Sequence, residues 1–210
     1  MSDQENTKKR RRAVKNIASE VRIRQILSAV RELLIQDGYK RLTMQKVADK
    51  AGIAVGHVQH YFPTKKILLQ NMFQFVSDEY IKQYNLILEK LSTDQPEESL
   101  KAIVDYILGG VSNENVRAFS FEFWALSIRY PDGKTTMATI NAHHQEVLAK
   151  LIHQISPGRD KELCGLRSIQ AASLLDGLFA HTLHLKTDSK KYRRLLEDTR
   201  RNLMRLAMDD

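Results

Sequence analysis

Hydrophobic residues recur with the period of an α-helix along almost the whole chain, and this pattern restricts the fold more than any other feature. Ile23, Leu27 and Val30, for example, fall on one face of a first helical segment. The pattern is rarely interrupted, because the 210 residues include only 9 Gly and 4 Pro. No strongly alternating run of β-branched residues predicts a strand. We therefore expect an all-α fold of about nine helices.

The composition excludes several classes of protein. An apolar fraction of 42% and a charged fraction of 28% are those of a folded globular chain. The single cysteine, Cys164, allows neither an internal disulfide nor a multi-thiolate metal site. No apolar run approaches the roughly 18 residues of a membrane span, and the N-terminal segment lacks the apolar stretch of a signal peptide. We expect a cytoplasmic protein, with no membrane among its partners.

Positive charge is confined to the N-terminal third of the chain. Residues 1–66 contain 15 Lys and Arg against 6 Asp and Glu, whereas residues 67–210 contain 18 against 19. The first segment therefore carries a net charge of +9 and the remainder a net charge of −1. Charge segregated in this way is typical of a surface that binds a polyanion, and DNA, RNA or an anionic membrane would each satisfy it.

The basic third shows the pattern of a helix-turn-helix unit. A first helix over about residues 20–37 ends at Gly38, and a short helix follows over residues 44–51. Gly52 then provides a tight turn into another short helix, residues 55–61. Two short helices joined by a glycine turn and braced by a longer helix are typical of a DNA-binding unit. The same geometry also fits a three-helix packing module that does not bind DNA.

The longer C-terminal part is expected to form a helical bundle. The first of its helices is long and would join the two domains. Phe119, Phe123 and Trp124 surround the third helix instead of lining one stripe, which is typical of a central helix. The predicted helices span about residues 65–91, 97–108 (ended by Gly109 and Gly110), 114–130, 131–155, 161–186 and 189–207.

The most specific motif in the chain lies in residues 43–69. Its elements, in order, are Thr43 at a helix start, Ala51-Gly52, Gly56, the pair Tyr61-Phe62, Lys65 and Leu68-Leu69. At this spacing the segment resembles the DNA-binding motif of the TetR family of transcriptional regulators. Residues 121–131 are similar to part of the C-terminal domain in the branch of that family that includes the choline-responsive repressor of betaine synthesis.

The resemblance implies a ligand-responsive transcriptional regulator, most simply a repressor. It would bind palindromic double-stranded operator DNA as a homodimer, with its third helix in the major groove, and leave when a small-molecule effector binds. The residues implied to contact DNA are Thr43, Met44, Gln45, Val55, Gly56, His57, Gln59, His60, Tyr61 and Lys65. The basic run Lys9, Arg10, Arg11 and Arg12 forms either a minor-groove arm or a solvated tail that only adds non-specific attraction.

Several of these residues carry chemical groups that suit a contact with DNA. Thr43 and the N–H groups in the first turn of its helix can hold a phosphate oxygen. Gly56 would let the backbone approach DNA closely, and Gln59 offers the donor and acceptor pair that matches adenine. The chain departs from the family where Ala54 replaces the usual serine or threonine cap, and where Gln59 replaces a common tyrosine.

We divide the chain into a basic flexible arm (residues 1–19), a helix-turn-helix DNA-binding domain (20–66, motif about 43–62) and a helical effector-binding and dimerisation domain (67–210). The candidate residues of the effector pocket are Tyr106, Phe123, Trp124 and His144. The candidate dimer interface consists of leucines on the last two helices, Leu174, Leu175, Leu178, Leu195 and Leu196. The identity of the effector stays open.

Two other classes of function remain as alternatives. His181 and His184 lie near Asp176 in the sequence, but no third well-spaced metal ligand is evident, and the adjacent His143-His144 pair diverges by about 100° on a helix. A helical metal-dependent enzyme is therefore the weakest alternative, and we expect no catalytic residue, metal or cofactor. The other alternative is a basic helical adaptor for RNA or a membrane, which would show no preference for a particular duplex sequence.

Overall fold

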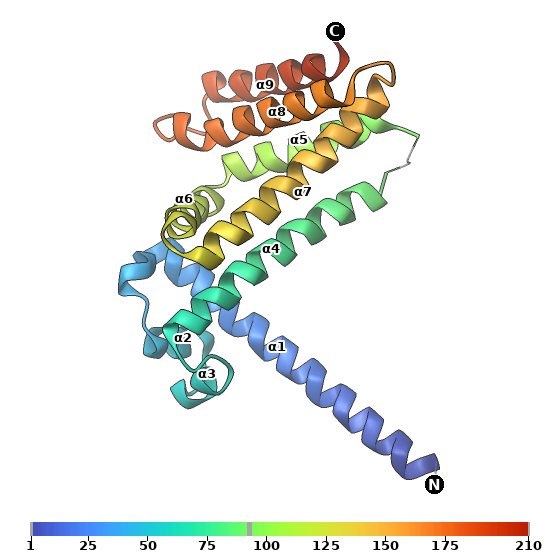
Figure 1. Ribbon diagram of the computed structural model, residues 1–210. Coiled ribbons are helices and arrows are strands. Elements are labelled where there is room, and N and C mark those ends of the chain that lie inside the picture. Colours follow the sequence, from blue (N-terminus) through green and yellow to red (C-terminus); the bar gives the residue numbers. More distant parts are fainter. Residues whose placement is uncertain (1, 92–93, 210) are drawn as a thin grey trace. The chain divides into compact units, whose positions relative to one another are not determined.

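The computed structural model describes the backbone of residues 2–91 and 94–209 and the side chains of residues 17–91 and 94–209. Every regular element in this part of the chain is an α-helix, which confirms the all-α prediction (Figure 1). No helix within these ranges is both long and apolar enough to cross a membrane. The helices are α1 (Ser2–Arg41), α2 (Met44–Ala51), α3 (Val55–Tyr61), α4 (Lys65–Glu89), α5 (Pro96–Ser112), α6 (Glu114–Arg129), α7 (Pro131–Ile155), α8 (Lys161–His181) and α9 (Lys190–Met208).

The chain forms two compact units, which divide between Phe75 and Val76. The division falls inside α4, so this one helix contributes its first turns to the N-terminal unit and the rest to the C-terminal unit. The boundary predicted from the sequence, after residue 66, lies nine residues earlier. The early turns of α4 belong with the first unit because their apolar side chains, including Leu68 and Met72, are almost completely buried.

The N-terminal unit packs α1 against α2 and α2 against α3. Its core contains Ile26 and Val30 of α1, Val47 of α2 and Val58 of α3, all with no exposed surface. These residues have the helical spacing that the sequence analysis used, so burial of one apolar stripe per helix explains how the three helices assemble.

Gly38 ends the straight part of α1, as the sequence predicted. Its φ of 69° and ψ of 167° lie in a region that essentially only glycine occupies. The backbone changes direction there, and the N–H of Leu42 then donates to the carbonyl of Tyr39 at 3.2 Å. The chain therefore reaches the start of α2 through a turn that other residues could adopt only with strain.

The start of α1 differs from the expectation. The helix begins at Ser2, whereas the sequence pattern predicts a start near residue 20 and a flexible arm over residues 1–19. Residues 8–18 contain no Gly or Pro and are rich in Lys, Arg and Ala, which extend a helix at little cost. The side chains of Lys9, Arg10, Arg11 and Arg12 lie outside the described residues, so their role in a minor-groove arm stays a prediction.

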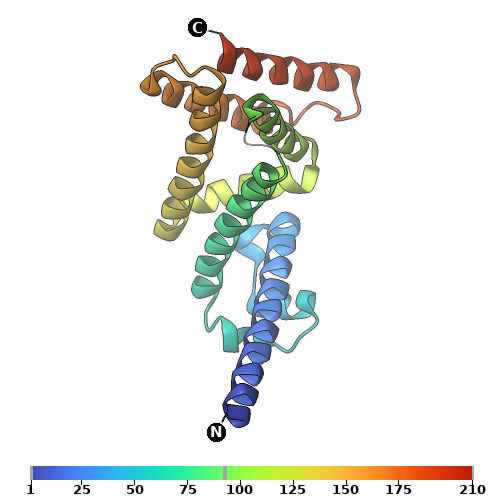
Figure 2. The ribbon, with the colours of Figure 1, turned by 90° about the vertical axis from the view of Figure 1, so that its right-hand side faces the viewer.

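In the C-terminal unit the central helices are α5 and α7, and not α6. Each of these two helices contacts the other as well as α6, α8 and α9 (Figure 2), and Ile103 of α5 and Leu148 of α7 are completely buried. The aromatic residues around α6 had suggested that α6 would be central. Phe121 and Trp124 are only partly buried, however, and Ile128 at the end of α6 is 73% exposed. An aromatic-rich helix at the side of a bundle thus mimics a central one in sequence.

Two helix ends were also predicted incorrectly. Helix α5 continues through Gly109 and Gly110 to Ser112, because this extension buries Val111 in the core. Helix α8 ends at His181, five residues before the predicted end, and turns fill the segment up to α9. Neither end carries a proline that would have marked it in the sequence.

Candidate nucleic-acid interface

The N-terminus of α2 forms a capped anchor on the surface of the N-terminal unit. Thr43 adopts an extended backbone conformation, and its side-chain oxygen accepts a hydrogen bond from the N–H of Lys46 at 3.2 Å. This interaction makes Thr43 the N-cap that the sequence predicted. The N–H groups of Met44 and Gln45 belong to the uncapped first turn, and a negatively charged oxygen is favoured there.

The turn after α2 has the geometry that the glycine pattern predicted. Gly52 adopts a left-handed conformation with φ 65° and ψ 35°, and its N–H points back to carbonyls at the end of α2. From α1, the side-chain amide of Gln25 donates to the carbonyl of Ala51 at 2.6 Å. This long-range bond satisfies a free helix-end carbonyl and fixes the turn against α1, and sequence periodicity gave no indication of it.

Helix α3 is attached to the unit by one face and exposes the other. Val58 has no exposed surface, and Phe62 just after the helix is 2% exposed. Tyr61 and Val55 are half-buried. The exposed residues of this helix are all among the predicted DNA contacts, namely Gly56, His57, Gln59 and His60.

Two local features of α3 agree with the sequence analysis. Ala54 occupies the N-cap position and makes no side-chain capping bond, so the start of α3 lacks the hydrogen bond that serine or threonine would add. Gly56 has an ordinary helical position, and a Cβ built on it meets no atom within 4 Å. Internal packing therefore does not require a glycine at this position, whereas close approach of an external backbone would.

Two ion pairs join α1 to α2 beside this surface. Lys46 contacts Asp37 at 2.5 Å, and Lys50 contacts Glu32 at 2.8 Å. The hydrogen bond from Lys46 holds the pKa of Asp37 below its usual range. Both pairs are at the surface, where such pairs add little stability, so their main effect is to orient α2 on α1. Sequence periodicity gives no sign of either pair, because the partners are nine and eighteen residues apart.

Lys65, a predicted phosphate contact, makes an internal interaction. Its Nζ donates to the carbonyl of Tyr39 at 2.8 Å and lies 4.0 Å from the centre of the Tyr39 ring. Partial burial lowers the pKa of the Lys65 ammonium. This side chain therefore links the first residue of α4 to the turn that follows Gly38. An ammonium has three N–H donors, so this one hydrogen bond leaves two available.

The four predicted pocket residues fall into two groups in the C-terminal unit. Phe123 stacks on Phe119 with ring centres 5.8 Å apart. The Trp124 ring meets the Phe179 ring edge to face, with ring centres 5.7 Å apart. Tyr106 and His144, in contrast, both lie against Tyr84. Phe123 and Trp124 are thus part of the aromatic packing around α6, whereas Tyr106 and His144 share a polar cluster.

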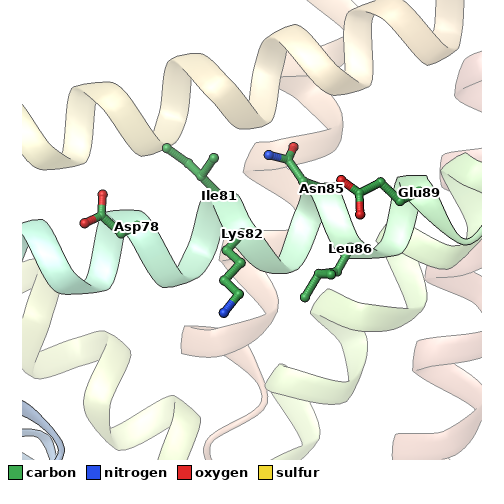
Figure 3. A pocket seen from close by; sticks show the side chains of 6 residues that line it. All are labelled: Asp78, Ile81, Lys82, Asn85, Leu86 and Glu89. Carbon is green, nitrogen blue, oxygen red and sulfur yellow. The ribbon is translucent and has the colours of Figure 1, made fainter. Parts of the chain in front are cut away.

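A hollow of about 320 Å³ runs along the surface of α4, and none of the predicted pocket residues lines it. Its lining side chains all belong to this one helix, so it is an open strip and not an enclosed cavity (Figure 3). They recur at helical spacing, Asp78, Ile81, Lys82, Asn85, Leu86 and Glu89.

The predicted dimer leucines also require a correction. Leu175 and Leu178 are 1% and 6% exposed and belong to the core of their own unit, so they are not available to a second subunit. Leu195 and Leu196 are half-buried against the same core, and Leu174 is 42% exposed. Helical periodicity identified an apolar stripe correctly but could not tell which side of α8 faced inward. The large apolar residues exposed on α8 are Leu174, which was predicted, and Leu163, Leu166 and Ile169, which were not.

The comparisons with known proteins agree with this geometry. Residues 26–72 match the family model for bacterial regulatory proteins of the tetR family, a segment that contains all of α2 and α3. The HTH-type transcriptional regulator BetI of Escherichia coli O17:K52:H18 is 26% identical over 188 residues, which cover 80% of this chain and 96% of that protein.

Two solved structures show the same fold at low identity. A TetR transcription regulator from Haloarcula marismortui ATCC 43049 matches with a TM-score of 0.73 at 19% identity, over 90% of this chain and 97% of that one. A transcriptional regulator from Saccharomonospora viridis in complex with choline matches with a TM-score of 0.70 at 19% identity, over 88% and 94% of the two chains. Residues 26–72 thus form the DNA-binding domain of the tetR family of bacterial regulatory proteins, and the similarity to BetI over most of both chains supports a transcriptional regulator of the TetR family.

Proposed function

We propose that the protein is a repressor that binds palindromic operator DNA as a homodimer and is released by a small-molecule effector. The observation that carries this proposal is the exposed face of α3, where His57, Gln59 and His60 surround a glycine. A helix of seven residues is not stable alone, so burial of Val58 is needed to hold this polar face outward. Such a face fits the edges of base pairs in a major groove.

The bases and the phosphates would be contacted by different parts of the unit. Gln59 can donate to and accept from adenine through its amide, and His57 and His60 add further donors or acceptors beside it. The N-terminus of α2 at Thr43 and the first residue of α4, Lys65, would contact phosphate oxygens. The net charge of +9 in residues 1–66 supports the approach to DNA in general without specifying a sequence.

The direct test is binding of the full-length protein to a duplex selected from a random pool and to a scrambled duplex, across a salt series. We expect Gln59→Ala to weaken binding to the selected duplex by about 1–3 kcal/mol and to leave binding to the scrambled duplex nearly unchanged, because contacts with bases determine sequence specificity. Gln154→Ala, an exposed glutamine on α7, is the matched control and should bind as the unchanged protein does. Equal loss on both duplexes would contradict the role of Gln59, and failure to select any sequence would contradict the proposed function.

Lys65 would have two roles, one inside the unit and one at DNA. Its bond to the Tyr39 carbonyl positions the start of α4 against the turn at Gly38, close in sequence to Thr43. The ammonium keeps its charge and two donors for a phosphate. The same residue would thus orient the phosphate anchor and form part of it.

Replacement of Lys65 separates these roles. Lys65→Met should lower the free energy of unfolding by about 1 kcal/mol through loss of the hydrogen bond and the ring contact. It should also make the plot of the logarithm of the DNA-binding constant against the logarithm of salt concentration less steep. The slope should decrease in magnitude by about 0.9, which is the effect of one phosphate contact. Lys66→Met, at the exposed neighbouring position, should leave stability unchanged. Urea unfolding and salt titrations measure the two effects, and an unchanged unfolding midpoint in Lys65→Met would rule out the internal role.

The exposed apolar face of α8 supports a homodimer. Leu163, Leu166, Ile169 and Leu174 are between 38% and 53% exposed on this one helix. An isologous pair of such faces would bury them and give the two-fold symmetry that a palindromic site needs. Arg159 and Arg167 donate to carbonyls at the C-terminal end of α9, which holds α9 in place beside α8.

A charge placed in this face should separate the subunits. We expect Leu166→Glu to convert the dimer to a monomer in analytical ultracentrifugation, because two carboxylates would be buried opposite an apolar surface. Ile128→Glu is the control, since Ile128 is 73% exposed and lies on α6. A dimer that persists in Leu166→Glu would place the interface elsewhere.

The release step would depend on an effector that prefers one conformation of the C-terminal unit. Helix α4 is continuous from Lys65 to Glu89 and contributes to both units, so a change in its C-terminal part has a covalent route to the DNA-binding unit. One solved structure of the same fold holds choline, which supports a small organic effector for this chain as well.

A further inference from the structure

The last helix, α9, concentrates positive charge on the C-terminal unit. Residues 190–208 contain 7 Lys and Arg against 2 Asp and Glu, a net charge of +5. The rest of residues 67–210 contains 11 Lys and Arg against 17 Asp and Glu, a net charge of −6. The nearly neutral total of this part of the chain therefore conceals a second segregation of charge, beside the one in the N-terminal third.

One side of α9 is fixed in the core, so the opposite side faces solvent. Tyr192 and Leu203 are 1% and 2% exposed. The Tyr192 hydroxyl donates to Oγ of Ser112 on α5 at 3.2 Å, and Nε of Arg200 pairs with Asp105 of the same helix at 2.5 Å. Helix α9 lies at the outside of its unit, beside α8, in both views (Figures 1 and 2). These contacts hold α9 in one rotation about its axis.

The cations on the outer side of α9 form a row along the helix. At 100° per residue, positions 190, 194, 201 and 205 fall within about 60° of one another around the axis. At 1.5 Å per residue, the row is about 22 Å long. The exposed cations of the helix are Lys190, Lys191, Arg193, Arg194, Arg201 and Arg205.

Two acidic residues interrupt the row without neutralising it. Asp198 lies about one turn from two of the arginines and pairs with Arg194 at 4.0 Å and with Arg201. Glu197 is exposed beside it. In the part of the chain that the structure describes, the other four exposed cations form no ion pair. Six exposed cations against two carboxylates leave a net charge of +4 on this side.

A linear row of fixed charges suits a linear polyanion. A single small anion is held best where several cations converge on one point, whereas these cations follow one another along a straight helix. Duplex DNA carries one negative charge per about 1.7 Å of its axis, so several phosphates lie along a row of this length. Four of the six exposed cations are arginines, whose planar group matches the geometry of phosphate oxygens.

A membrane surface fits this helix less well than a nucleic acid. A helix that lies in a membrane interface inserts its apolar side among the lipids. The apolar side of α9 is buried in the core of its own unit, as the exposure of Tyr192 and Leu203 shows. Only the charged side is available to a partner, and contact through charge alone is typical of binding to a phosphate backbone.

We propose that the outer side of α9 is a second binding site for duplex DNA, which contacts the phosphate backbone and reads no sequence. The site belongs to the C-terminal unit and the helix-turn-helix to the N-terminal unit. The protein can therefore hold a second duplex while α3 is engaged with the first. This inference goes beyond the proposed function and does not require a specific operator.

The first experiment saturates the full-length protein with an unlabelled duplex selected from a random pool. A fluorescent scrambled duplex is then added at about 50 mM salt, and its anisotropy is measured. The test variant is Arg194→Gln/Arg201→Gln/Arg205→Gln, because glutamine removes the charge and keeps helix propensity. We expect the unchanged protein to bind the second duplex and the variant to bind it at least about tenfold more weakly, with equal affinity for the selected duplex.

A second triple variant is the matched control. Lys134→Gln/Lys150→Gln/Lys161→Gln removes the same charge from exposed positions on α7 and α8 and should bind the second duplex as the unchanged protein does. Circular dichroism melts verify that both variants fold. The proposal is wrong if the second duplex does not bind, if the α9 variant binds it normally, or if both variants lose it equally, because overall charge would then be responsible.

The salt dependence provides an independent readout. For the second duplex, neutralising three phosphate contacts should reduce the slope of log affinity against log salt by about 2.7 in magnitude. The control variant should keep the slope of the unchanged protein. A slope that the α9 variant shares with the control would contradict direct phosphate contacts.

Other occupants of the same side give different results. Polyglutamate stands for an acidic protein, and vesicles of phosphatidylserine and phosphatidylcholine stand for a membrane. Binding of either one, without binding of a second duplex, would assign the charged side to that partner and refute the DNA site. The α9 variant should also sediment as the unchanged protein does, and a smaller assembly would make this side a contact between subunits.

Failure of the proposed function is distinguishable from failure of this inference. If no duplex is selected from the pool, the proposed function fails, and the scrambled duplex alone is titrated at low salt. The unchanged protein and the control variant should then bind more copies of the duplex per protein than the α9 variant. Equal numbers in all three proteins would refute the second site as well.

Discussion

The burial of Val58 and Phe62 is the constraint on which the DNA-binding surface depends. Helix α3 has seven residues, too few to be stable without packing, and only these apolar side chains attach it firmly to the unit. With that face fixed, His57, Gln59 and His60 must point to solvent. Gly52 and Gly38 provide the two turns with positive φ that bring α2 and α3 to this arrangement. Specificity for DNA would thus follow from an apolar contact and two glycines.

Those features were predictable because each leaves a local signal in the sequence. Thr43, Gly52 and Pro63 mark the ends of α2 and α3, and the structure has both helices at the predicted residues. The residues Val47, Ala48 and Ala51 have the spacing of one helix face, and all three are buried.

The errors arose where tertiary packing overrode a local signal. Gly109 and Gly110 looked like a helix end, but burial of Val111 extends α5 past them. Leu175 and Leu178 lie on an apolar stripe that faces the core, while other leucines of α8 face outward. The bond between Lys65 and Tyr39 joins residues 26 positions apart, so no periodic pattern could reveal it.

The central claim is that two copies of α3 read DNA through the face that carries Gln59. Hydroxyl-radical footprinting of the full-length protein on a duplex selected from a random pool tests it most directly. The account predicts two protected patches on one side of the duplex, about one helical turn apart, related by the symmetry of the sequence, and lost in Gln59→Ala. Uniform protection along the duplex, or a pattern that Gln59→Ala leaves unchanged, would contradict it.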